Sequence, residues 1–142
     1  MTDHVAHAEA EISASPQQVW DALTDPDAIS TWMMGAKVET DWEEGSPITW
    51  SGEYDGTPYQ DKGEILEVAP SRRLRLTHYT PLSGGEDVPE NYHTLDYRLR
   101  GEGDRTTLTL DQGGNDSADQ AEQFSGTWQL MLDGLKEYVE AG

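Results

Sequence analysis

The sequence predicts an α+β domain in which one curved, antiparallel sheet of six to seven strands wraps around one long C-terminal helix. Three observations lead to this prediction. Apolar residues between positions 117 and 139 recur every three or four positions, which is the spacing of one helix face. Apolar residues between positions 36 and 112 recur every second position, as in strands. The connections after residue 35 are short or modest, so neighbouring strands should run antiparallel.

Residues 4–12 are expected to form the first strand. Ala6, Ala8, Ala10 and Ile12 alternate with polar residues and would share its inner face. Alanine fills little volume. The sequence therefore leaves open whether another element comes close to this face or whether a space remains there.

Two short helices are expected after this strand. Ser15 can cap the first helix, and Pro16 suits its first position because proline has no N–H to lose. The pair Asp25-Pro26 ends the first helix and starts a second, which closes near Gly35. Because two short helices bury little alone, we expect them to plug one end of the sheet.

Six further strands are expected before the long helix. Their predicted ranges are 36–42, 48–54, 59–68, 73–78, 92–99 and 106–110. Asp55-Gly56 is a strong signal for a two-residue hairpin, and residues 80–90 read as a loop. Residues 112–114, which contain two glycines, are expected to lead to the long helix, with Ser117 as its N-cap.

Composition limits the classes of function. The 142 residues fit a single domain spanning 1–142, and the chain has no cysteine. Its net charge of −19 argues against nucleic acid and anionic membranes as partners. No segment approaches the roughly 20 apolar residues of a membrane span, so we expect a soluble, cytoplasmic protein. The acidity fits a well-solvated surface; adaptation to high internal salt is the alternative.

Several stretches resemble the family related to the activator of heat-shock-protein ATPase (AHSA-like), within the START-related SRPBCC superfamily. The resemblance covers essentially the whole chain, although Thr127 stands between the glycine and tryptophan that the family usually has adjacent. The stretches are Ser15-Pro16 through Val19-Trp20, Ala22 to Pro26 through Trp32, Gly63 to Val68 with Pro70 and Leu74, and Gly126-Thr127-Trp128 through Leu132, Leu135-Lys136 and Tyr138.

This resemblance implies a helix-grip (START/Bet v-like) fold with a cavity between the sheet and the long helix. Similar proteins include ligand carriers, co-chaperone domains and cyclase-like proteins. The family has no shared catalytic motif, so the resemblance assigns no catalytic residue, metal ligand or cofactor to this chain.

The predicted cavity would be lined by aromatic and apolar residues with a few polar groups, as ligand pockets commonly are. The expected occupant is a small apolar or aromatic molecule whose polar end lies near the two histidines. The alternative is that the aromatic residues simply fill the core. The predicted lining is Trp32, Trp50, Leu76, His78, His93, Tyr97, Phe124, Trp128 and Met131.

The two histidines form a candidate polar pair. If Leu76 opposes Leu95 across a hairpin, His78 opposes His93 on the inner face. Two imidazoles can shuttle a proton or bind a metal. We find no third inward ligand in the pattern, so a metal is not predicted and hydrogen bonds to neighbours or water are the favoured interpretation.

Glu67 is a second candidate acid or base. Strict alternation from Gly63 and Ile65 would point it inward, whereas a bulge near Leu66 would point it to solvent. The sequence leaves both orientations open.

Arginines concentrate on the outer face of two neighbouring predicted strands. A nucleic-acid patch is one interpretation, but the net charge argues against it, and we favour a surface ladder of ion pairs. The arginines are Arg72, Arg73, Arg75, Arg98 and Arg100, with Glu64 and Asp96 as expected partners.

The leading hypothesis is a domain that binds or carries a small molecule and has no catalytic activity of its own. One alternative is a cyclase- or hydrolase-like enzyme that uses His78, His93 or Glu67 in the cavity. Another is a co-chaperone-like module that interacts with proteins through its surface. Exposed sheet edges would also allow a homodimer.

Overall fold

The computed structural model describes residues 4–33, 35–54, 56–80, 86–88, 91–115 and 117–141. Seven antiparallel strands form one sheet in the order β1-β7-β6-β5-β4-β3-β2, and the predicted fold class is confirmed. The elements are β1 (His4–Ile12), α1 (Pro16–Thr24), α2 (Pro26–Trp32), β2 (Lys37–Glu39), β3 (Pro47–Tyr54), β4 (Thr57–Ala69), β5 (Arg73–His78), β6 (His93–Glu102), β7 (Arg105–Asn115) and α3 (Ala118–Ala141).

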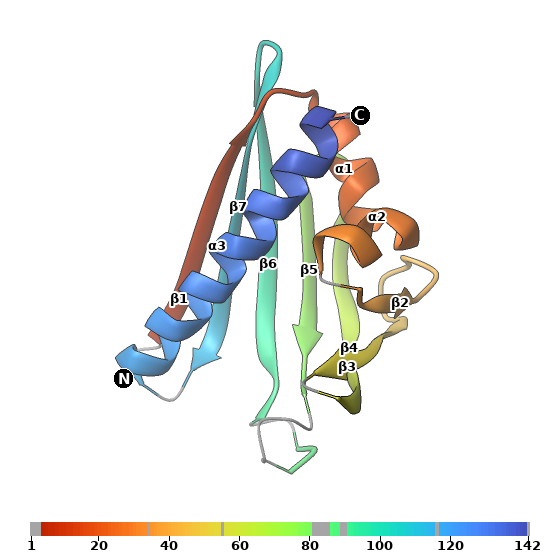
Figure 1. The fold of residues 1–142 in the computed structure, drawn as a ribbon, viewed down its shortest axis with the longest axis vertical. Helices are drawn as coiled ribbons and strands as arrows, with labels where there is room; N and C mark the ends of the chain where they lie inside the picture. Colours follow the sequence, from red (N-terminus) through yellow and green to blue (C-terminus); the bar gives the residue numbers. More distant parts are fainter. Residues whose placement is uncertain are drawn as a thin grey trace.

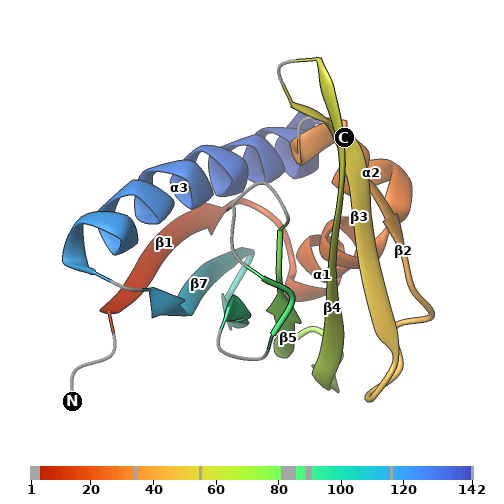
Figure 2. The same cartoon turned by 90° about the horizontal axis from the view of Figure 1, so that it is seen from below.

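The helices share the concave side of the sheet. Helix α3 lies along β1 and β7, while α1 and α2 cover the part of the sheet near β5 and β4 (Figure 1). Seen from below, β3 and β4 turn away from β1 and β7, so the sheet curves around the helices (Figure 2). No helix in the described ranges is long and apolar enough to cross a bilayer.

The two short helices begin where the sequence predicts. Ser15 and Gln18 form a capping box at α1, in which the Ser15 Oγ accepts from the Gln18 backbone N–H at 3.2 Å. The Asp25 carboxylate accepts from the Asp27 N–H at 3.1 Å and caps α2. The Trp32 indole N–H donates to the Ala22 carbonyl at 2.9 Å, which fastens α2 to α1.

The alanines of β1 let α3 approach closely. Of the two possibilities that the sequence left open for this face, a close neighbouring element is therefore the correct one. Polar side chains of α3 form hydrogen bonds with the backbone groups on the free edge of β1. We expected exposed sheet edges, but this edge is covered by the helix. The bonds are His7 N–H to Ser125 Oγ (2.9 Å), Glu9 N–H to Gln129 Oε1 (3.1 Å), Ser13 N–H to Glu140 Oε2 (2.9 Å), Gln129 Nε2 to Glu9 O (2.8 Å) and Lys136 Nζ to Glu11 O (2.9 Å).

Strands β2 and β7 differ most from the prediction. Strand β2 has only three residues, and Trp42, which we expected at its end, has a left-handed φ of 59°. Strand β7 continues to Asn115. Its glycine-containing segment is therefore strand and not a connection, because Gly113 and Gln112 still pair with the start of β6.

Several smaller predictions concern turns. Ser117 caps α3 as expected, since its Oγ accepts from the Gln120 N–H at 3.1 Å. Gly56 has the positive φ (81°) that the hairpin needs, but Asp55 lies outside the described residues. Most of the predicted loop over residues 80–90 also lies outside them.

Strand β4 changes partner halfway along its length. Its first half pairs with β3, where Gly63 faces Ile48, and its second half pairs with β5. A side chain on Gly63 would meet the Thr77 carbonyl oxygen at only 1.8 Å, so only glycine fits this crossing. The register then shifts between Ile65 and Glu67. This shift is a bulge, one of the two possibilities that the sequence left open for the orientation of Glu67.

Candidate functional site

A small cavity lies between the sheet and the two short helices. Its volume is about 20 Å³, which holds about one water molecule and is far below the roughly 300–1,000 Å³ of ligand pockets. Large side chains therefore fill most of the space in which we predicted a ligand. The lining is Leu23, Ile29, Trp32, Met33, Trp42, Ile48, Trp50, Leu74, Leu76 and Tyr97.

Four of the predicted site residues line this cavity: Trp32, Trp50, Leu76 and Tyr97. All four are buried. Burial raises the pKa of Tyr97 well above its ordinary value, so its hydroxyl stays protonated and remains a hydrogen-bond donor. Their role in ligand binding stays a prediction.

Other predicted site residues lie closer to α3. The His93 ring packs edge-on against Phe124 with 5.4 Å between ring centroids, and its Nδ1 lies 3.1 Å from the Gly113 carbonyl. Phe124 and Met131 are partly buried and pack against the core. These residues lie outside the lining of the small cavity.

Trp128 packs in the core and makes a specific polar contact. Its indole N–H donates to the Gln112 Oε1 at 3.0 Å, and Gln112 is only 1% exposed. The pattern of the sequence did not single out Gln112. Trp128 thus has a structural partner on β7 instead of facing an open cavity.

His78 forms a polar pair with Asp61 beside Trp50, which lines the cavity. It faces His93 across β5 and β6, as the alternation predicted. Its Nε2 lies 2.9 Å from the Asp61 Oδ2, and its ring packs edge-on against Trp50 with 5.0 Å between centroids. The side chains of His78 and Asp61 are 15% and 13% exposed, so the pair is largely shielded from water.

Asp61 is the residue that our sequence reasoning missed. We expected no inward carboxylate near the histidines. Yet Asp61 lies on β4 directly opposite the buried Trp50, and it precedes Gly63 and Ile65 by two and four positions. Extending the alternation of β4 back from those two residues would have placed it on the inner face.

Two polar atoms of this pair are buried without a hydrogen-bond partner among the described residues. They are the His78 Nδ1 and the Asp61 Oδ1. Buried polar atoms normally have a partner, and a missing one marks a place for water or a ligand. In the tautomer whose Nε2–H donates to Asp61, the His78 Nδ1 is an acceptor for a hydroxyl or N–H.

Glu67 does not belong to this site. The bulge after Ile65 places it opposite Arg75, and its carboxylate lies 3.7 Å from the Arg73 guanidinium on the outer face. The proposed role of Glu67 as an acid or base in the cavity is therefore wrong.

The outer-face arginines form the predicted ladder in part. Asp96 binds Arg73 at 2.8 Å and Arg98 at 3.1 Å. Burial alone would raise the pKa of Asp96, but the hydrogen bonds from both arginines outweigh it and lower that pKa. Among the described residues Glu64, which we expected to take part, forms no ion pair with an arginine, and Glu67 takes its place.

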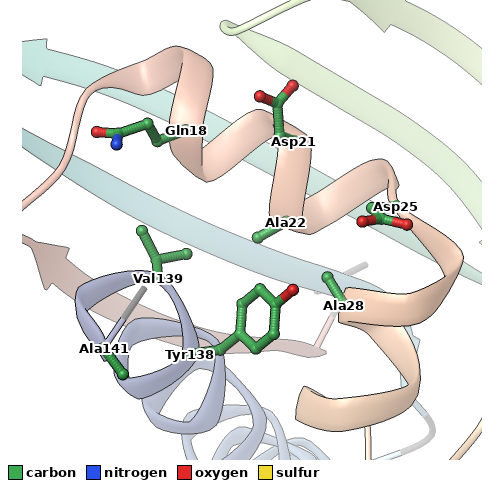
Figure 3. A pocket seen from close by; sticks show the side chains of 8 residues that line it. All are labelled: Gln18, Asp21, Ala22, Asp25, Ala28, Tyr138, Val139 and Ala141. Carbon is green, nitrogen blue, oxygen red and sulfur yellow. The ribbon is translucent and has the colours of Figure 1, made fainter.

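A groove of about 500 Å³ opens on the helical side, between α1, α2 and the C-terminal end of α3. Figure 3 shows Tyr138 and Val139 of α3 facing Ala22 of α1 and Ala28 of α2, with Asp21 and Asp25 at the rim. The neighbours of the two alanines, Leu23 and Ile29, line the small cavity. Helices α1 and α2 therefore form the wall between the groove and the cavity.

No group of three or more His, Cys, Asp or Glu residues within the described ranges is arranged to hold a metal ion. The two histidines on the inner face have one carboxylate, Asp61, close to His78. An imidazole next to a carboxylate can form hydrogen bonds to a ligand and can transfer a proton.

The curved sheet, the two short helices and the long C-terminal helix define a helix-grip domain. Residues 13–140 match the family described as Activator of Hsp90 ATPase homolog 1-like protein, and the chain belongs to this family. No curated protein sequence matches the chain significantly.

Solved structures show the same fold. The solution structure of ChR145 from Cytophaga hutchinsonii is 36% identical with a TM-score of 0.85, over 99% of this chain and 97% of that one. DynU16, a putative protein in the dynemicin biosynthetic locus, is 22% identical with a TM-score of 0.82, over 99% of this chain and 49% of that one. The Aha1 dimer from Colwellia psychrerythraea is 18% identical with a TM-score of 0.75, over 100% and 98%.

Proposed function

We propose that the protein binds a small apolar or aromatic molecule in the interior between β3–β6 and the helices α1 and α2. The observation that carries this proposal is a pair of buried atoms with no hydrogen-bond partner in the described part of the chain. They are the His78 Nδ1 and the Asp61 Oδ1, beside the cavity-lining Trp50. A ligand with a hydroxyl or N–H at one end would give the imidazole a partner while its apolar part contacts indole rings.

Binding requires the interior to enlarge, because a volume of about 20 Å³ does not admit such a ligand. The thin wall formed by α1 and α2 separates this space from the outer groove. Outward movement of these two short helices would join the two spaces, and the flexible, partly buried Met33 could rearrange at low cost. The groove near Tyr138 is then the entrance for the ligand.

The test is a thermal-unfolding and calorimetric comparison of 2-naphthol with naphthalene, which share a shape but differ in one hydroxyl. We expect 2-naphthol to bind more tightly. Free ligand at a hundred times its dissociation constant stabilises the folded state by about 2.7 kcal/mol. His78→Phe should abolish the preference for 2-naphthol, and the control His7→Phe on the outer face should keep it. Absence of stabilisation by either compound would contradict the proposal.

Acid–base catalysis in the same interior is a second candidate, and the His78–Asp61 hydrogen bond favours it. A carboxylate that orients an imidazole is a common arrangement for a general base. A ligand identified by the first test can be incubated with the protein and followed by mass spectrometry. Asp61→Asn should abolish any turnover while binding persists, whereas a carrier forms no product with either protein.

A further inference from the structure

Besides the small cavity and the groove, a hollow lies on the outer face of the sheet, which is the face turned away from the helices. It has a volume of about 520 Å³, within the range of small-molecule sites. Its polar lining comes from β1, β5, β6 and β7 and from the turn before β5. The groups that matter are Arg72, Arg73, Arg98, Arg100, Thr107 and Thr109.

This hollow concentrates positive charge in a strongly acidic protein. Four of the nine lysines and arginines of the chain line it, although the net charge is −19. Glu9 is the only acidic residue of its described lining. Three further carboxylates, those of Asp96, Glu67 and Glu102, lie outside this lining but within 3.7 Å of its arginines.

Internal ion pairs neutralise only part of this charge. Arg73 and Arg98 face each other directly across β5 and β6, an unfavourable placement of like charges that Asp96 relieves by contacting both, while Glu67 contacts Arg73 as well. Arg100 has only a 3.6 Å contact with Glu102, and both side chains are about three-quarters exposed. Arg72 forms no ion pair with any described residue. The exposed Arg72, together with Arg100 in its long and exposed contact with Glu102, is thus accessible to an incoming anion.

The chemistry of the hollow selects a phosphate-bearing ligand. Guanidinium groups bind phosphate through paired hydrogen bonds, and the two threonine hydroxyls add donors. Arg98 and Arg100 lie two residues apart on one face of β6, about 6–7 Å along the strand, which suits adjacent phosphates better than one. No aromatic ring lines the described hollow, so nothing there would stack on a base.

A second copy of the chain fits this face poorly. A symmetric pair would place arginines against arginines, and a head-to-tail contact would build a ring or an open chain of many copies. A long nucleic acid would also meet the repulsion of the remaining acidic surface. We propose that the outer-face hollow binds a short oligophosphate group, as in pyrophosphate or the phosphate chain of a nucleotide. The hollow lies on the other face from the interior, so this proposal is independent of the ligand proposed above.

The experiment is an NMR titration of the ¹⁵N-labelled protein with sodium pyrophosphate, with ionic strength held constant by sodium chloride. We expect amide shifts at Arg98, Thr107 and Thr109. The double variant R72Q/R100Q should bind at least tenfold more weakly. The matched control K37Q/R105Q, which removes two exposed charges outside the hollow, should change affinity less than twofold.

Further arms distinguish the source of the phosphates. The dissociation constants of tripolyphosphate and ATP should agree within threefold, and adenosine should not bind. The proposal is overturned by equal weakening in both double variants, by shifts elsewhere only, or by adenosine binding in the hollow. Tighter binding of octaglutamate than of pyrophosphate would also overturn it, in favour of an acidic polypeptide partner.

Discussion

The helices contact the two halves of the sheet in different ways. At the β1–β7 half, alanines allow α3 to approach until its side chains bond to the backbone of β1. At the β3–β5 half, indole rings and two short helices fill a wider space and leave a small cavity and two unpartnered polar atoms. The difference indicates that close packing of α3 stabilises the first half, while the second half keeps the small cavity beside which the proposed binding would take place.

The largest effect is expected from Trp128→Ala in the β1–β7 half. Removing this packed ring should cost about 3–5 kcal/mol and leaves the Gln112 oxygen without its donor. Trp50→Ala, which removes a ring that already borders the cavity, should cost less. Urea unfolding of both variants measures the difference. An equal or larger loss for Trp50→Ala would remove the energetic contrast between the halves.

A smaller loss is expected from Gly63→Ala at the bend of β4. The added methyl would meet the Thr77 carbonyl at 1.8 Å, so the cost should reach the upper end of the roughly 1–3 kcal/mol seen for overpacking. Because Thr77 precedes His78, the displaced backbone should also shift the His78 imidazole resonances.

The matched control for this change is Gly126→Ala on α3, where nothing lies within 4 Å of the new methyl. It should stabilise the protein by about 0.5–1 kcal/mol, because alanine is the better helix former. Thermal unfolding measures both variants. Equal effects of the two substitutions would show that the bend tolerates a side chain.

The smallest effect concerns the exposed pair of His7 and Asp111 on the outer face of β1 and β7. The hydrogen bond from the His7 Nδ1 to Asp111, at 2.6 Å, raises the pKa of His7. A raised folded-state pKa means that the stabilisation is fully present below the unfolded pKa of about 6.5 and is lost as pH rises through the folded value. His7→Gln should therefore lower the melting temperature slightly at pH 5.5 and leave it unchanged at pH 8.5. The same loss at both pH values would contradict this account.

Alternation and capping predicted much of the fold. The spacing of Leu76 and Leu95 was enough to place His78 opposite His93, and Ser15 predicted the start of α1. The bulge before Glu67 was undecidable, because it arises where β4 passes between β3 and β5 and depends on contacts distant in sequence.

The site was less predictable than the fold. The position of Asp61 followed from the parity of β4 and was overlooked, whereas the small volume of the cavity could not have been foreseen. That volume depends on how the rings of Trp32, Trp50 and Tyr97 pack together in three dimensions. The extension of β7 was missed because two glycines suggested a turn, although β6 still offered them a partner.

The covered edge of β1 also has a consequence for hydrogen exchange. The amides of His7, Glu9 and Ser13 are protected by side chains of α3 and not by a neighbouring strand. Their exchange rates therefore report how often the helix lifts from the sheet, position by position along its length. Ser13, bonded to Glu140 near the C-terminal end of α3, would report opening beside the proposed entrance, while His7 monitors the opposite end of the same helix.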